Sequence, residues 1–117
     1  MLSFQNRFHG HGSLRYVYKN GTALRSHLLI VKYVSNAHRK HSRFSVVVSK
    51  KVHKGAVGRN RIRRRVYEVI RAELPQMKQA YDIAIIVFSS ELMTIPYDEL
   101  KDVIHQLFSQ GDLYKKQ

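Results

Sequence analysis

A chain of 117 residues, 44% of them hydrophobic and none of them cysteine, is long enough for one compact domain and too short for two. Its composition excludes disulfides, thiolate nucleophiles and thiolate zinc sites, and it has no apolar run near the ~20 residues of a membrane-spanning helix and no apolar signal-peptide block at its start. The formal net charge of +13 is unevenly divided: residues 1–67 hold 16 lysines and arginines and no carboxylate, whereas residues 68–117 hold 5 against 8. We therefore expect one cytoplasmic domain over residues 1–117 whose partner is a nucleic acid, in preference to a membrane surface.

The first part of the chain predicts an arm followed by a short helix. Residues 1–12 include two glycines and little periodicity, so we expect a flexible basic arm. A helix of about two turns should follow, with Ser13 as its N-cap, Tyr18 among its regularly spaced large residues and Gly21 as its C-terminal stop.

Two strands are predicted next, over residues 24–34 and 43–49, because both are rich in β-branched and aromatic residues. The polar segment SNAHRKHS between them favours an antiparallel hairpin with an exposed loop. The residues that alternate toward the core in the second strand are Phe44, Val46 and Val48. Ser45 and Ser49 would face the other side, where small side chains let a ligand approach the backbone.

A basic loop then leads into an amphipathic helix, predicted from about Gly58 to Leu74. Its apolar stripe consists of Ile62, Val66, Val69, Ile70 and Leu74. Five arginines, at positions 59, 61, 63, 64 and 65, occupy its first turns, where cations oppose the helix dipole unless an anion binds. Arg59 and Arg63 lie near the edge of the stripe, so we expect them to line a cleft between this helix and the sheet.

The remaining elements complete an α+β pattern. Pro75 should end the arginine-rich helix, and the apolar run of residues 81–88 predicts a buried strand that is parallel to the strand before the helix. A last amphipathic helix should start at Pro96 and end before Gly111, leaving residues 111–117 as a loose tail.

The basic segment resembles a known family. Ser49, Lys50 and Lys51, a short basic loop, and then Arg59, Asn60, Arg61, Ile62, Arg63 and Arg64 are similar to the signature of the bacterial ribonuclease P protein subunit. The resemblance covers nearly the whole chain. It implies one α+β domain in the order αβββαβα, with a four-stranded mixed sheet, a ribosomal-protein-like topology and a left-handed βαβ crossover, against the usual right-handed rule.

The resemblance also implies a function: the family assists a catalytic RNA that removes the 5′ leader from precursor tRNA. Catalysis would belong to the RNA, with Mg²⁺ bound mainly by that RNA, and the protein would bind it 1:1 without catalytic side chains of its own. The positions that match the family's contacts to the catalytic RNA are Lys50, Lys51, Lys54, Arg59, Asn60, Arg61, Arg63 and Arg64. Those that match its cleft for the single-stranded leader are Tyr18, Lys32, Ser45 and Ser49. The chain departs from the family pattern at Lys32, often aromatic, at Arg65, usually apolar, and at Tyr67, often basic.

The sequence shows no evident metal site or nucleophile with which the protein itself could act as an enzyme. His9 with His11 and His38 with His41 are closely spaced but have no carboxylate nearby to complete a zinc site, and His105 has no evident nucleophile to activate. The alternative that stays open is a plain RNA-binding module, such as a ribosomal protein, without a catalytic partner. That class needs basic surface anywhere, whereas the ribonuclease P subunit needs one arginine-rich face and a separate leader cleft.

Overall fold

A computed structural model describes residues 6, 8, 12–36 and 39–115. Its helices and strands, in chain order, are α1 (Gly12–Asn20), β1 (Thr22–Arg25), β2 (Leu29–Ser35), β3 (Arg43–Val48), α2 (Ala56–Glu73), β4 (Tyr81–Val87) and α3 (Tyr97–Gln110). Two short 3-10 turns, η2 (Leu74–Gln76) and η3 (Ser90–Met93), follow α2 and β4. The predicted αβββαβα order is confirmed.

The sheet has the strand order β1-β2-β4-β3, in which β3 and β4 are parallel and the other neighbours antiparallel. The parallel pairing is as predicted, but the hairpin between residues 24–34 and 43–49 is wrong, because β4 lies between β2 and β3. The single strand expected over residues 24–34 is also wrong. Ser26 turns the chain there: its hydroxyl accepts hydrogen bonds from the backbone N–H groups of Leu28 and Leu29, at 3.1 and 3.2 Å.

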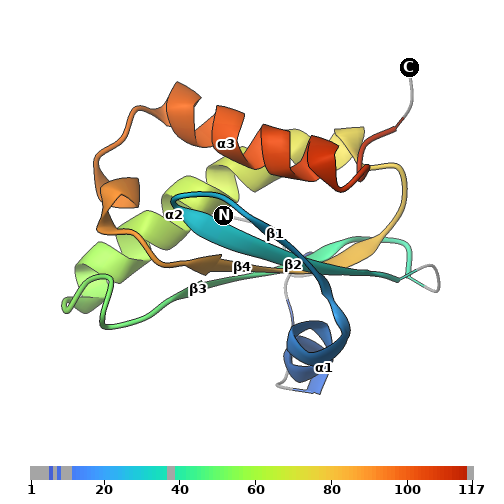
Figure 1. Ribbon diagram of the computed structural model, residues 1–117, viewed down its shortest axis with the longest axis horizontal. Coiled ribbons are helices and arrows are strands. Elements are labelled where there is room, and N and C mark those ends of the chain that lie inside the picture. Colours follow the sequence, from blue (N-terminus) through green and yellow to red (C-terminus); the bar gives the residue numbers. More distant parts are fainter. Residues whose placement is uncertain (1–5, 7, 9–11, 37–38, 116–117) are drawn as a thin grey trace.

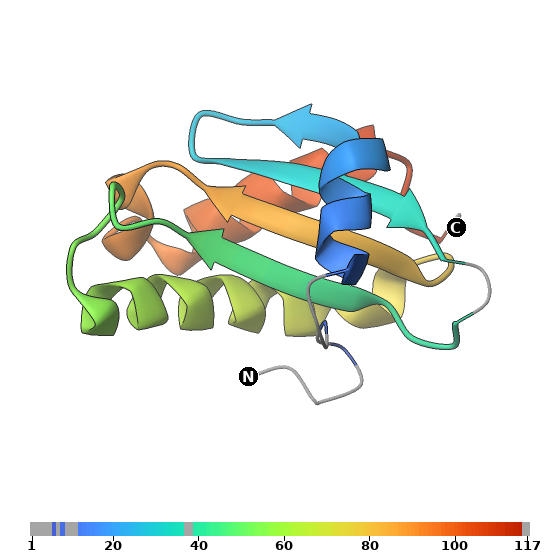
Figure 2. The same cartoon turned by 90° about the horizontal axis from the view of Figure 1, so that it is seen from below.

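The helices lie on both faces of the sheet: α2 and α3 cover one face, and α1 crosses the other (Figures 1 and 2). In Figure 2, α1 is nearest the viewer, α2 lies behind the sheet, and β3 and β4 point the same way. When those strands are turned to point upward in this view, the chain passes from β3 behind the sheet to β4 on the right of β3. The β3–α2–β4 crossover is therefore left-handed, as the family resemblance implied.

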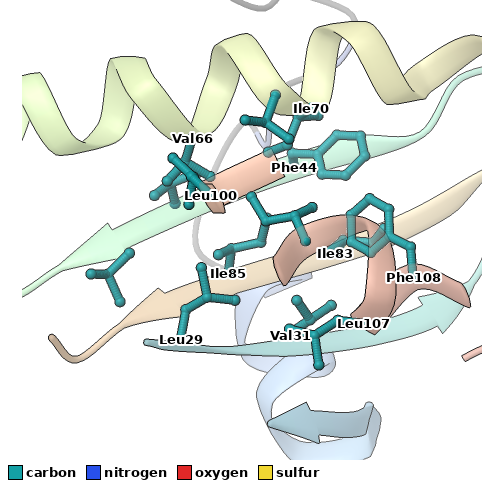
Figure 3. Close-up of a cluster of buried hydrophobic side chains, with 14 of the residues drawn as sticks. Leu29, Val31, Phe44, Val66, Ile70, Ile83, Ile85, Leu100, Leu107 and Phe108 are labelled. Carbon is teal, nitrogen blue, oxygen red and sulfur yellow. The ribbon is translucent and has the colours of Figure 1, made fainter. Parts of the chain in front are cut away.

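The core lies between the sheet and the pair α2 and α3. Phe44, Val46 and Val48 are buried as their alternation predicted, and so are the stripe residues of α2 except Leu74, which is half-buried in η2. Figure 3 shows Phe44 of β3 and Ile83 and Ile85 of β4 facing side chains of α2 and α3. Because α2 begins at Ala56, two residues earlier than predicted, the basic loop is shorter than the sequence suggested.

Helix α1 ends at a position where a residue larger than glycine would clash. The N–H of Gly21 donates to the carbonyl of Val17 at 2.8 Å, and a Cβ at Gly21 would lie 2.5 Å from that same oxygen. The C-terminal stop predicted there is confirmed, whereas the helix begins at Gly12, one residue before the predicted N-cap.

The segment after α3 differs from the loose tail expected over residues 111–117. Leu113 is only 1% exposed, its carbonyl accepts from the N–H of Lys78 at 2.9 Å, and the N–H of Lys115 donates to the carbonyl of Gln76 at 2.7 Å. Residues 111–115 are therefore fixed to residues 76–78, which follow α2, because an apolar side chain anchors them in the core. Residues 116–117 lie outside the described part of the chain.

Most of the predicted arm, including His9 and His11, also lies outside the described residues, as does His38. Within the arm, Asn6 is buried and its amide donates to the carbonyl of Ser42 at 2.8 Å. Among the helices of the described residues, none is both long and apolar enough to cross a membrane.

Candidate nucleic-acid interface

The basic loop between β3 and α2 is folded back onto the first turn of α2. The Nδ1 atom of His53 accepts from the N–H of Gly55 at 3.1 Å, and its ring lies against Gly58, where a Cβ would come within 2.2 Å of the imidazole. Arg59 fastens the same loop, because its Nη1 donates to the carbonyls of His53 and Lys54 at 3.0 and 2.7 Å. Gly58 and Arg59 thus hold the loop in one conformation.

The eight residues predicted to contact RNA all lie on this loop and the first turns of α2, and together they are called the arginine face. They are Lys50, Lys51, Lys54, Arg59, Asn60, Arg61, Arg63 and Arg64. All are exposed except Arg59 and Arg63, which are half-buried. The Asn60 amide does not cap the helix. Its oxygen accepts from Nη1 of Arg63 at 2.6 Å and so orients that guanidinium.

The five arginines of α2 do not all serve the same purpose. Arg65 donates to the carbonyl of Leu92 at 2.6 Å and to that of Ile95, so its guanidinium holds the η3 segment against α2. Arg59 is similarly engaged with the loop. Arg61 and Arg64 are exposed. The sequence set Arg59 and Arg63 at the edge of the apolar stripe and Arg65 at a position that is usually apolar in the family, but it could not show which carbonyls Arg59 and Arg65 contact.

The arginine face itself contains no carboxylate. The first turn of α2 has no acidic residue, and its N-cap, Gly55, supplies no side-chain hydrogen bond. The ion pairs found within the described residues lie elsewhere: Arg43 with Asp82, Arg71 with Glu68, Lys78 with Asp112, and His105 with Glu73. Several cations near a helix N-terminus whose first turn has no acidic residue create a surface on which a bound polyanion would be stabilised.

The cleft predicted between the sheet and α2 is wrong. That space is filled by buried side chains, among them Phe44, Val66 and Ile70 (Figure 3). Ser45 belongs to the opposite side of the sheet, as does Lys32 of β2, because both alternate with core residues in their strands. The leader candidates are therefore on the face crossed by α1, which is called the open face.

The strand register places two of the leader candidates, Lys32 and Ser45, in one row on the open face. Lys32 and Ser45 both pair with Ala84 of β4, so the three residues form one row across the sheet. Nζ of Lys32 donates to the backbone carbonyl of Tyr18 on α1 at 3.2 Å and lies 5.8 Å from the centroid of the Tyr18 ring. Burial raises the pKa of the Tyr18 hydroxyl. Ser49 is exposed just beyond the end of β3.

A hollow of about 270 Å³ connects the two surfaces, and the sequence reasoning did not find it. Its lining residues are Val47, Ser49, Lys51, Val52, Ile86, Val87 and Phe88. It holds one leader candidate, Ser49, and one residue of the arginine face, Lys51. Phe88 is 40% exposed, and the guanidinium of Arg25 lies 5.1 Å from its ring centroid. A strict two-residue alternation continued from Ala84 through Ile86 would have pointed to Phe88.

The side chains that the structure describes do not bring together the ligands of a metal site. Among the described residues, no group of three or more histidine, aspartate or glutamate side chains lies close enough together to hold a metal ion. The arginine face contributes only cations and one amide.

The fold and the two surfaces define a small basic α+β domain with an uncompensated cationic face beside an open sheet. A family profile described as "Ribonuclease P" matches residues 2–111. The chain is 35% identical to the ribonuclease P protein component of Synechocystis over 97 residues, covering 83% of this chain and 77% of that protein. With the component of Pseudanabaena it shares 32% identity over 112 residues, which is 95% of each chain.

Two solved structures show the same fold. The RNase P protein of Staphylococcus aureus superimposes with a TM-score of 0.81 at 21% identity, covering 94% of this chain and 98% of that one. The RNase P protein of Thermotoga maritima gives a TM-score of 0.75 at 23% identity, covering 86% and 94%. The chain belongs to the ribonuclease P protein family.

Proposed function

We propose that this chain is the RNA-binding subunit of ribonuclease P and assists a catalytic RNA in removing the 5′ leader from precursor tRNA. The arginine face would dock on the catalytic RNA, and the open face would hold the single-stranded leader. One protein would bind one RNA, in the cytoplasm. The observation that carries the proposal is the presence of two separate surfaces that meet at Ser49 and Lys51, together with membership of the family.

The arginine face suits docking to a folded RNA. Its lysines and exposed arginines would contact backbone phosphates and release counterions, which gives strong and salt-dependent affinity. Arg63 is held by Asn60 at 2.6 Å, so this guanidinium is pre-positioned and loses less conformational freedom on binding. Arg59 supports this surface by fixing the backbone of His53 and Lys54.

The open face suits an extended single strand without strong sequence preference. Ser45 is small and only half-buried, so a nucleotide can come close to the sheet beside it, and Lys32 supplies a cation beside the Tyr18 ring. Half-buried Ile30, Ile86 and Val47 form the next row across the strands. Bases stack on aromatic side chains with little regard to sequence. A surface with few aromatics should therefore bind leaders modestly.

In this proposal the chemistry belongs to the RNA, with Mg²⁺ bound mainly by RNA ligands. The protein's cations would strengthen assembly and substrate affinity, so they should lower the magnesium concentration at which the RNA works. No side chain of this chain is assigned a catalytic role.

The experiment is cleavage of a 5′-extended precursor tRNA by a bacterial ribonuclease P RNA at low magnesium, with and without the protein. The RNA of Synechocystis is a suitable choice, because that organism's protein component is 35% identical and can serve as the positive control. We expect stimulated cleavage at the correct position. Tight RNA binding without stimulation, while the positive control works, would overturn the proposal in favour of a ribosomal-type module.

A further inference from the structure

One side of α2, next to the arginines, carries a hollow that docking to phosphates does not explain. It has a volume of about 410 Å³ and is lined by Val57, Asn60, Arg63, Arg64 and Tyr67. The lining residues recur every three or four positions, so they form one stripe along about three turns of α2. Apolar groups stand at its two ends, with polar and cationic groups between them.

The two apolar ends differ in how they are held. Val57 is 79% exposed and takes no part in the core, which is unusual for a β-branched residue in a helix that is otherwise clearly amphipathic. Tyr67 is half-buried and packs against the core, so its side chain is held in place while it still lines the hollow. A fixed aromatic ring beside an open apolar floor is a platform on which a flat group can stack.

The polar groups between the ends select the kind of partner. Arg63 is oriented by the oxygen of Asn60 at 2.6 Å, Arg64 is exposed, and the lining includes no carboxylate. A second copy of this chain placed on the hollow would bring arginines against arginines. A ligand with a flat apolar face and an attached anion matches the hollow, and a nucleotide has both features.

We propose that the hollow between Val57 and Tyr67 binds one unpaired nucleotide of the RNA that docks on the arginine face. The base stacks on the Tyr67 ring, and its phosphate is held by Arg64. This inference rests on the proposed function, because it assigns an additional contact within the same docking surface. It gives Tyr67, which stands where the family often has a basic residue, a role in recognising an unpaired base.

The test compares binding to a ribonuclease P RNA across a salt series. Tyr67→Ala should weaken binding about tenfold or more without changing the salt slope, since stacking releases no counterions, whereas Arg64→Ala should lower the slope by about one. Tyr67→Phe should bind like the wild type. Tyr67→Leu keeps an apolar side chain against the core and should behave like Tyr67→Ala, which separates stacking from stability. Tyr97→Ala, at an exposed tyrosine on α3, is the matched control.

The contacted nucleotide can be found by replacing Tyr67 with a photoreactive phenylalanine derivative and mapping the crosslink on the RNA. Removing the base at that position should abolish the difference between the wild type and Tyr67→Leu. If Arg61→Ala and Arg64→Ala weaken binding while Tyr67→Leu does not, the hollow is not a nucleotide site and the proposed function stands. If the arginine variants also bind normally, the docking surface itself is wrong.

Discussion

Arg43 and Asp82 form a buried, two-pronged ion pair that joins β3 to β4. Nε of Arg43 donates to Oδ1 of Asp82 at 2.9 Å and Nη2 to Oδ2 at 2.6 Å, and both side chains are less than one-tenth exposed. Asn36 donates to Oδ2 as well, at 2.9 Å, and the ring of Phe8 lies 5.0 Å from the Arg43 guanidinium. The pair therefore ties β3 and β4, the parallel strands of the described sheet, together on the open face.

Removing one partner of this pair should be strongly destabilising. Asp82→Ala would leave the Arg43 cation buried without a counter-charge, and we expect a loss of about 3–5 kcal/mol in the free energy of unfolding. Urea denaturation measures it. Glu68→Ala breaks the exposed pair with Arg71, 3.9 Å apart, and should cost less than about 1 kcal/mol. Equal losses of unfolding free energy in the two variants would show that the buried Arg43–Asp82 pair is no more important for stability than the exposed pair.

The arginines of α2 should separate into two groups when each is replaced by alanine. Arg61→Ala and Arg64→Ala should weaken RNA binding and lower the salt slope by about one unit each, with little change in melting temperature. Arg65→Ala should instead lower the melting temperature, because it frees the carbonyls of Leu92 and Ile95, and should leave the salt slope unchanged. Filter binding at salt concentrations from about 50 to 400 mM measures the salt slope of each variant. An Arg65 variant with the largest loss of slope would contradict the structure.

Because His53 packs on Gly58, replacing His53 should relieve the loss of RNA binding that a side chain at position 58 causes. Gly58→Ala would place a methyl group 2.2 Å from the imidazole, so the ring must leave its place and the loop that carries Lys54 should lose its conformation. We expect weaker RNA binding in Gly58→Ala, with α2 intact by circular dichroism. His53→Ala removes the clash, so the double variant His53→Ala, Gly58→Ala should bind no worse than His53→Ala alone. Additive losses would mean that the ring does not mediate the effect.

Leader binding should depend on Lys32 and on leader length together. Affinity for precursor tRNA should fall as the first few leader nucleotides are removed. Lys32→Ala should reduce the gain from a long leader several-fold while leaving affinity for leaderless tRNA unchanged, since the lysine lies beside Tyr18 on the open face. Lys101→Ala, at an exposed lysine on α3, is the control. If the affinities of the wild type and of Lys32→Ala did not depend on leader length, the open face would have no role in leader binding.

Stability should fall at alkaline pH through Tyr114. Burial, and secondly the negative charge of Glu73, raise the pKa of its hydroxyl above the ordinary value near 10. Because the folded protein favours the neutral hydroxyl, this contribution is fully present below about pH 10 and is lost as the pH rises above it. Tyr114→Phe should therefore show a shallower decline of melting temperature above pH 10. A decline as steep as that of the wild type would contradict this. Some decline should remain, since burial also raises the pKa of Tyr18 and Tyr81.

The local elements of this fold follow from local patterns. The alternation of Phe44, Val46 and Val48 and the helical stripe around Val66 and Ile70 determine which side of each element is apolar, and burial follows. The number of strands and the hand of the crossover depend on how distant elements pack, so they were predicted from the family resemblance and not from local patterns. The break at Ser26 was missed because Leu24 precedes it and an apolar run starts at Leu28 soon after it. One hydroxyl that accepts two backbone hydrogen bonds is enough to turn the chain there.

The residues of the candidate site were easier to predict than their placement. The arginine face lies on one loop and one helix, so its members are neighbours in sequence and in space. The leader candidates come from α1, β2 and β3, and the side of the sheet on which they meet depends on where α2 packs. That is why the cleft was expected on the wrong side. The family pattern marked Arg65 as unusual, but its contacts could not be predicted because its acceptors, at residues 92 and 95, lie 27 and 30 positions away.

The central position of β4 has a consequence for how the protein is made. β2 and β3 each pair with β4 and not with each other, so neither can complete its pairing until residues 81–87 have left the ribosome. Until then the emerging chain carries all 16 positive charges of residues 1–67 without a finished sheet to support them. Pairing over such sequence separations delays folding. The open face, which is built on these strands, therefore cannot form before β4 emerges, when all of the carboxylate-free segment has already been synthesised.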